Sequence, residues 1–82
     1  MPNREDATTL KRPIYPMPAF VEAALRSRRL VTAYRARPPY QQNDYVLWIT
    51  SAQRPETQQK RLTQMLDELA IGGVYMRMVW RG

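Results

Sequence analysis

The hydrophobic positions of the chain follow a helical period through most of residues 18–71. The clearest helix is predicted from Pro55 to the Gly72-Gly73 pair, because proline suits the first helical position and glycine suits a left-handed end. Four apolar residues inside it repeat at i, i+3, i+4 and i+7, as on one buried face: Leu62, Met65, Leu66 and Leu69.

Three shorter helices are predicted before it, over residues 18–26, 28–36 and 40–52. Ser27 is expected to cap the second, and the pair Pro38-Pro39 to end it, since proline cannot continue a helical hydrogen-bond ladder. Apolar residues recur at helical spacing in the first and third. The predicted core therefore consists of Phe20, Leu25, Tyr45, Trp48, Ile49, Leu62, Met65, Leu66 and Leu69.

The last nine residues alternate between two faces in the manner of a β-strand, with Val74, Met76, Met78 and Trp80 on one side. No second segment of comparable quality is present to pair with this strand. We therefore expect the tail to dock as an extended strip on the helices, or to pair with the tail of a second copy in a homodimer.

The predicted fold class is all-α, a small bundle of about four helices with an extended C-terminal segment. Residues 1–13 mix charge, threonine and proline without periodicity, so we expect a flexible arm there. Residues 14–82 are expected to form a single helical domain. A chain of 82 residues can bury only a small core.

The chain has neither cysteine nor histidine. This removes disulfides, thiolate or imidazole zinc sites and nucleophilic systems that depend on histidine. An acid and base pair built from Asp44 beside Tyr45 and Glu56 near Arg54 is an alternative, but carboxylates at helix starts usually serve the helix dipole. We expect no catalytic residue, no cofactor and no metal.

A net charge of +6 and a pI of about 10.3 favour polyanionic partners. Five arginines within twelve residues form a candidate polyanion-binding strip: Arg26, Arg28, Arg29, Arg35 and Arg37. The alternative is a solvated face of a basic protein. A helix-turn-helix reading would make residues 40–52 the recognition helix, but that segment has no lysine or arginine, so only non-specific nucleic-acid contact is retained.

The first residues of the chain are polar, and no stretch approaches the ~18 apolar residues that a membrane span needs. We therefore expect no membrane span and a cytoplasmic location.

Three stretches carry a family resemblance: "RPIYPMP", "ARPPYQQNDYVLWI" and "SAQRPETQQKRLTQMLDEL". In order and spacing, over residues 12–69, the chain resembles the YdeI/OmpD-associated family of bacterial proteins, often labelled bacteriocin-protection proteins. The resemblance implies a helical domain linked to tolerance of bacteriocins or cationic antimicrobial peptides. It implies no catalytic activity, cofactor or defined site.

Arg54, Lys60 and Arg61 match the family pattern, whereas Gln53 and Gln58 stand where basic residues are usual. With two residues of the tail, the matching cations make a candidate interaction surface: Arg54, Lys60, Arg61, Tyr75 and Arg77. Because a basic protein repels cationic peptides at long range, sequestration is a poor mechanism. We predict a non-enzymatic interaction module that binds another protein or a polyanion, with non-specific nucleic-acid binding through the arginine strip as the alternative.

Overall fold

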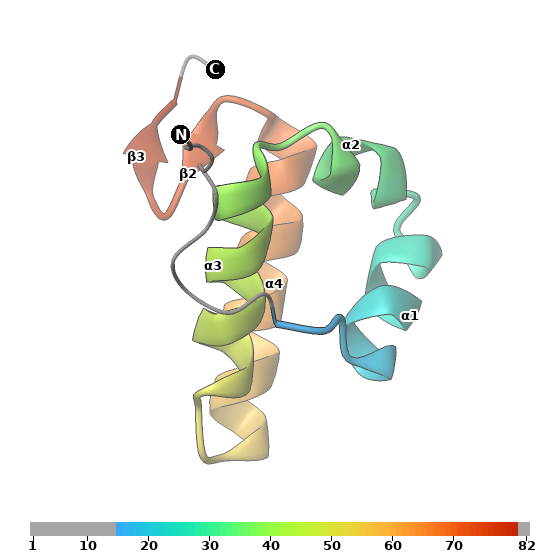
Figure 1. Ribbon diagram of the computed structural model, residues 1–82, viewed down its shortest axis with the longest axis vertical. Coiled ribbons are helices and arrows are strands. Elements are labelled where there is room, and N and C mark those ends of the chain that lie inside the picture. Colours follow the sequence, from blue (N-terminus) through green and yellow to red (C-terminus); the bar gives the residue numbers. More distant parts are fainter. Residues whose placement is uncertain (1–14, 81–82) are drawn as a thin grey trace, which may run out of the picture.

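The computed structural model describes residues 15–80 (Figure 1). The flexible arm predicted for residues 1–13 lies outside the described residues. Four helices and a two-stranded sheet follow one another along the chain: α1 (Ala19–Ser27), α2 (Val31–Arg35), α3 (Pro39–Thr50), α4 (Pro55–Ile71), β2 (Val74–Tyr75) and β3 (Met78–Val79).

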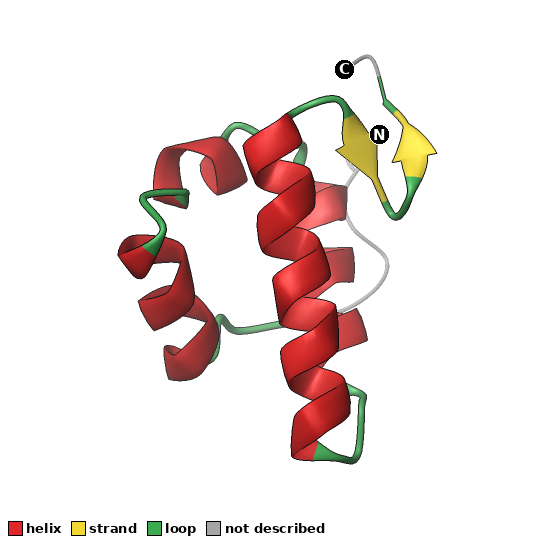
Figure 2. Cartoon of the chain, turned by 180° about the vertical axis from the view of Figure 1, so that it is seen from behind, coloured by secondary structure: helices red, strands yellow, loops and turns green. Residues whose placement is uncertain are grey.

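Helices α3 and α4 lie side by side and antiparallel, and they form the centre of the molecule (Figures 1 and 2). Each begins with proline at its first position, Pro39 and Pro55, where the missing backbone N–H costs no helical hydrogen bond. Helix α4 ends at Gly72, whose φ of 94° is a left-handed conformation that glycine adopts without strain.

Helices α1 and α2 form a shorter arm against one side of the central pair (Figure 1). The prediction that Ser27 caps α2 is wrong, because Ser27 is the last residue of α1. After α1 the chain turns at Arg29, which has a φ of 59°, and the backbone N–H of Leu30 donates a hydrogen bond to the carbonyl of Leu25 at 2.8 Å. This left-handed turn delays the start of α2 to Val31, so α2 has only five residues.

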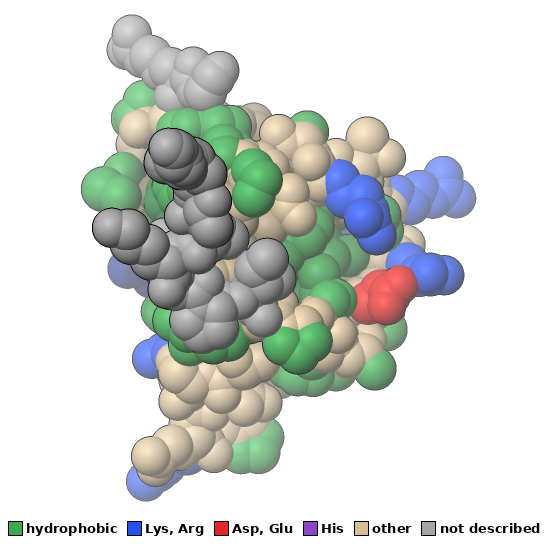
Figure 3. Space-filling view, in the orientation of Figure 1, with side chains coloured by type: hydrophobic (Ala, Val, Ile, Leu, Met, Phe, Trp, Pro, Cys, Tyr) green, Lys and Arg blue, Asp and Glu red, His purple; other side chains and the backbone are tan. Residues whose placement is uncertain are grey.

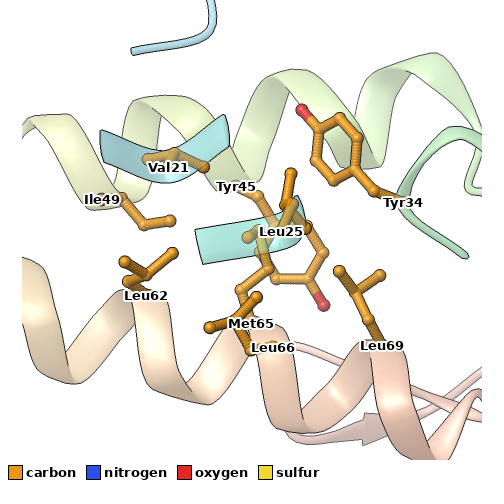
Figure 4. Close-up of a cluster of buried hydrophobic side chains, with 9 residues drawn as sticks. All are labelled: Val21, Leu25, Tyr34, Tyr45, Ile49, Leu62, Met65, Leu66 and Leu69. Carbon is orange, nitrogen blue, oxygen red and sulfur yellow. The ribbon is translucent and has the colours of Figure 1, made fainter. Parts of the chain in front are cut away.

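The core lies where α1, α2, α3 and α4 meet (Figure 4). Seven predicted core residues are buried: Leu25, Tyr45, Ile49, Leu62, Met65, Leu66 and Leu69. Trp48 is half-buried and packs against this cluster, whereas Phe20 is 38% exposed, which contradicts its predicted burial. The buried face of α1 passes through Val21 and Leu25, and Phe20 falls on its flank.

The tail is a β-hairpin, so the extended strip predicted for it is wrong. Val74 pairs with Val79 and Tyr75 with Met78 in antiparallel register. The turn between them consists of Met76 and Arg77, with φ values of 50° and 64°. Neither is a residue that favours left-handed backbone, which is why the alternating sequence gave no sign of a turn.

Candidate interaction site

Glu68 connects α4 to the hairpin. Its side chain is buried, and its carboxylate accepts hydrogen bonds from the backbone N–H groups of Met76 at 2.8 Å and Arg77 at 2.9 Å. The hydroxyl of Tyr45 and the amide of Gln64 donate to the same carboxylate. Four donors therefore compensate the burial of the charge and hold the left-handed turn in place.

The buried surroundings of Glu68 also change the acidity of the neighbouring Tyr45 hydroxyl. Burial raises the pKa of the Tyr45 hydroxyl well above its usual range, and the hydrogen bond to Glu68 raises it further. The phenol therefore remains a hydrogen-bond donor at neutral pH.

The fixed turn carries Arg77 over the side of α4, where an open groove of about 710 Å³ runs along the helix. We call it the α4 groove and define it by five of its lining residues: Trp48, Lys60, Arg61, Gln64 and Arg77. The Nε of Arg77 donates to the Oε1 of Gln64 at 3.1 Å, which holds the guanidinium beside α4. Three residues of the predicted interaction surface are thus brought together.

Arg61 and Trp48 form a fixed wall of the α4 groove. A guanidinium nitrogen of Arg61 donates to the backbone carbonyl of Trp48 at 2.6 Å, and its central carbon lies 5.4 Å from the centre of the indole ring. The bond also satisfies a carbonyl in the last turn of α3, where the helix dipole favours a cation. Arg61 is therefore positioned before any partner arrives.

The α4 groove carries more positive than negative charge. Lys60 is exposed and lines the groove with Arg61 and Arg77, while among residues 15–80 the only other exposed charged residue that lines it is Asp67. Asp67 is already paired with Arg28, at 3.2 Å. Glu68 also lines the groove, but its carboxylate is covered by its four donors.

Two residues of the predicted surface lie elsewhere. Arg54 is exposed at the N-cap of α4, outside the groove lining. Tyr75 is half-buried and packs against the core, where its hydroxyl donates to Asp44 at 2.9 Å and its ring makes edge contacts with Tyr40 and Tyr45.

The carboxylates considered for acid and base chemistry have separate surroundings. Asp44 accepts the hydrogen bond of Tyr75 in the middle of α3, and Glu56 is exposed in the first turn of α4. Within residues 15–80, no three Asp or Glu side chains come together in a group that could hold a metal ion.

The arginine strip is divided among different environments. Four of the five are exposed: Arg26 pairs with Glu22 at 2.7 Å and Arg28 pairs with Asp67, whereas Arg29 and Arg35 form no ion pair within residues 15–80. Arg37 is buried, which contradicts its assignment to a binding face.

The surroundings of Arg37 give the physical reason. Its guanidinium donates to Gln41 and to the backbone carbonyl of Glu68, both at 3.1 Å, and lies 4.7 Å from the centre of the Trp80 ring. It therefore neutralises the negative end of α4 and joins three elements of the fold.

Sequence reasoning missed Trp48 and Gln64 as groove residues, and it missed Glu68, which accepts hydrogen bonds from Gln64 and from the hairpin turn. A signal for Glu68 was present, because it lies three residues after Met65 and so at the edge of the buried stripe. Gln58, where the family pattern suggested a basic residue, donates to the carbonyl of Ala52 at 2.9 Å and thus supports the connection between α3 and α4.

The family model described as bacteriocin-protection, YdeI or OmpD-associated matches residues 15–72. The chain belongs to this bacteriocin-protection family. The matched segment contains all four helices and the Trp48, Lys60, Arg61 and Gln64 positions of the α4 groove, while Arg77 follows it. Comparisons with curated proteins and with solved structures gave no match. Over residues 15–80, no helix combines the length and the apolar character needed to cross a membrane.

Proposed function

We propose that the chain is a non-catalytic interaction module of the bacteriocin-protection family, which binds an acidic segment of a partner protein in the α4 groove. One observation carries this proposal: cations from α4 and from the hairpin turn line the same groove beside a half-buried tryptophan. Protection would then follow from engaging another protein, since the positive charge of the chain disfavours contact with cationic peptides.

The fixed geometry of the groove supports a protein partner. Arg61 is held by Trp48 and Arg77 by Gln64, so binding costs less side-chain order than it would for mobile cations. Guanidinium groups pair with carboxylates through two parallel hydrogen bonds, and Trp48 offers an aromatic contact between the charges. An extended segment with several Asp or Glu side chains matches this arrangement.

The proposal can be tested by fluorescence anisotropy with labelled oligoglutamate as the probe, and with oligoglutamine of the same length and a single-stranded oligonucleotide as comparisons. The test variant combines Lys60→Gln with Arg77→Asn, because asparagine tolerates the left-handed backbone at Arg77. Arg29→Asn is the matched control for Arg77→Asn, since Arg29 has a φ of 59°, is exposed and does not line the groove.

We expect oligoglutamate to bind and oligoglutamine not to bind. The double variant should weaken oligoglutamate binding by at least about threefold, because the free energies of two exposed charge contacts are lost together. Arg29→Asn should leave it unchanged. Equal losses in the double variant and the control would overturn the α4 groove as the site. Tight oligonucleotide binding that is lost in Arg29→Asn would favour the nucleic-acid alternative instead.

A further inference from the structure

A second hollow lies on the other side of the core, between helices α1 and α2 and the start of α3. We call it the arm pocket and define it by five of its lining residues: Met17, Leu25, Val31, Tyr34 and Arg35. Figure 3 shows it on the right, where basic and acidic side chains surround a recess floored by hydrophobic ones. Its volume of about 490 Å³ falls in the range of roughly 300–1,000 Å³ that is typical of small-molecule sites. It shares no lining residue with the α4 groove.

The walls of this arm pocket are predominantly apolar. Leu25 and Tyr34 are buried and belong to the core, and Met17 and Val31 are half-buried beside them. The hydroxyl of Tyr34 is directed to the backbone carbonyl of Gln42, at 3.2 Å, so the ring presents carbon to its surroundings. A hydrocarbon chain placed here would contact packed carbon atoms and displace water from apolar surface.

The shortness of α2 explains why the recess stays open. Helix α2 packs on α1, α3 and α4 beside the recess, but it has only five residues. Its single buried residue, Tyr34, fills only part of the space.

Among the residues that the structure describes, the charged side chains lining the arm pocket leave one cation available. Glu22 and Arg26 neutralise each other through their ion pair at 2.7 Å. Arg35 is exposed and lines the same pocket, and its guanidinium forms no ion pair within residues 15–80. The complement of this arrangement is a single negative charge at one end of an apolar body.

We propose that the arm pocket binds a small alkyl carboxylate of the fatty-acid type, with its hydrocarbon chain against Met17, Leu25 and Val31 and its carboxylate on Arg35. The apolar walls select the chain, and the Arg35 guanidinium, which is unpaired within residues 15–80, selects a monoanion. The inference does not depend on the α4 groove, so each of the two sites can fail while the other stands.

The first test follows methyl resonances by NMR while octanoate, decanoate, 1-decanol or decylammonium is added. We expect decanoate to shift the methyl signals of Met17, Leu25 and Val31, and to leave those of the exposed Ile71 and Val79 in place. Each added methylene should tighten binding by up to about fourfold. The alcohol should bind more weakly than the carboxylate, and the ammonium compound most weakly.

Variants assign the two ends of the ligand. Arg35→Gln should weaken decanoate binding by about three- to tenfold and remove its preference over 1-decanol. Arg29→Gln is the matched control, because Arg29 is also exposed and unpaired within residues 15–80 but lies outside the pocket lining. Val31→Phe, which fills the pocket, should abolish binding while thermal unfolding shows an intact fold.

Three results would overturn the proposal. The first is that decanoate at millimolar concentration leaves the methyl signals of the pocket unshifted. The second is that the shifted signals are those of Ile71 and Val79, as expected for non-specific detergent contact. The third is that Arg29→Gln weakens decanoate binding as much as Arg35→Gln. Because Arg35 is exposed, its variant gives a decisive answer even if Val31→Phe does not fold.

Discussion

The carboxylate of Glu68 is buried at the junction of α4 and the hairpin, where two backbone amides, a phenol and a side-chain amide donate to it. A neutral amide at this position would turn an NH₂ group towards one of these donors. The cost would be the loss of charge-assisted hydrogen bonds together with a buried unpaired donor.

Glu68→Gln should therefore lower the free energy of unfolding by about 2–3 kcal/mol. Asp67→Asn is the matched control on the adjacent residue, because it removes only an exposed ion pair with Arg28 and should cost less than about 1 kcal/mol. Urea denaturation at neutral pH measures both variants. Similar urea denaturation midpoints for the Glu68→Gln and Asp67→Asn variants would show that the stability of the hairpin does not depend on the Glu68 carboxylate.

Individual residues were predicted well where one periodic pattern fixed their environment. Leu62, Met65 and Leu69 are buried because α4 has one apolar face, which packs into the core. Arg37 was misassigned, because its burial depends on the carbonyl of Glu68 and the ring of Trp80, which are far away in sequence. Local charge patterns carry no information about such partners.

Among the elements, the end of α4 shows how backbone conformation limits the sequence. Gly72 and Gly73 are adjacent, yet only Gly72 has a left-handed φ, of 94°. A Cβ atom at Gly72 would meet nothing within 4 Å, and one at Gly73 would meet only the carbonyl of Trp80 at 3.8 Å. The two positions therefore differ in backbone strain and hardly at all in available space.

Gly72→Ala should reduce stability by about 1–2 kcal/mol, because alanine resists the left-handed conformation. Gly73→Ala should be neutral within about 0.5 kcal/mol. Thermal or urea unfolding of the pair gives the comparison. A larger loss at Gly73 than at Gly72 would contradict the conformational explanation.

The helices were predicted from local rules, and the hairpin was not. Apolar spacing located α3 to within two residues, and Pro55 with the Gly72-Gly73 pair located α4. The turn at Met76 and Arg77 is imposed by Glu68, eight and nine residues earlier, and neither turn residue carries a conformational preference for it. The α4 groove was missed as a unit for the same reason, since Arg77 reaches it only through that turn.

At the scale of the whole molecule, the pH dependence of stability should reflect two tyrosines of the core. Burial raises the pKa of both Tyr34 and Tyr45 above the ordinary value of 10.0. A raised pKa in the folded state means that the unfolded chain releases these protons first as pH rises. Their contribution is complete below about pH 10 and is lost progressively above it.

The free energy of unfolding should thus begin to fall at about pH 10 and continue to fall as the pH rises further, as measured by urea denaturation at each pH. The double variant Tyr34→Phe with Tyr45→Phe should be less stable at neutral pH, because both hydroxyls are hydrogen-bonded, but its stability should change less over this pH range. An unchanged slope in the double variant would assign the alkaline loss to other groups.

The hairpin also bears on where the folding unit of this protein stops. The segment that defines the family ends at residue 72, but the Glu68 carboxylate finds its backbone donors at Met76 and Arg77, and Arg37 lies against Trp80. A fragment trimmed to the family segment would keep every helix and leave two buried ions of opposite charge without these contacts. The boundary for expression or for fusion to another domain therefore belongs beyond Trp80, even though the recognisable sequence stops earlier.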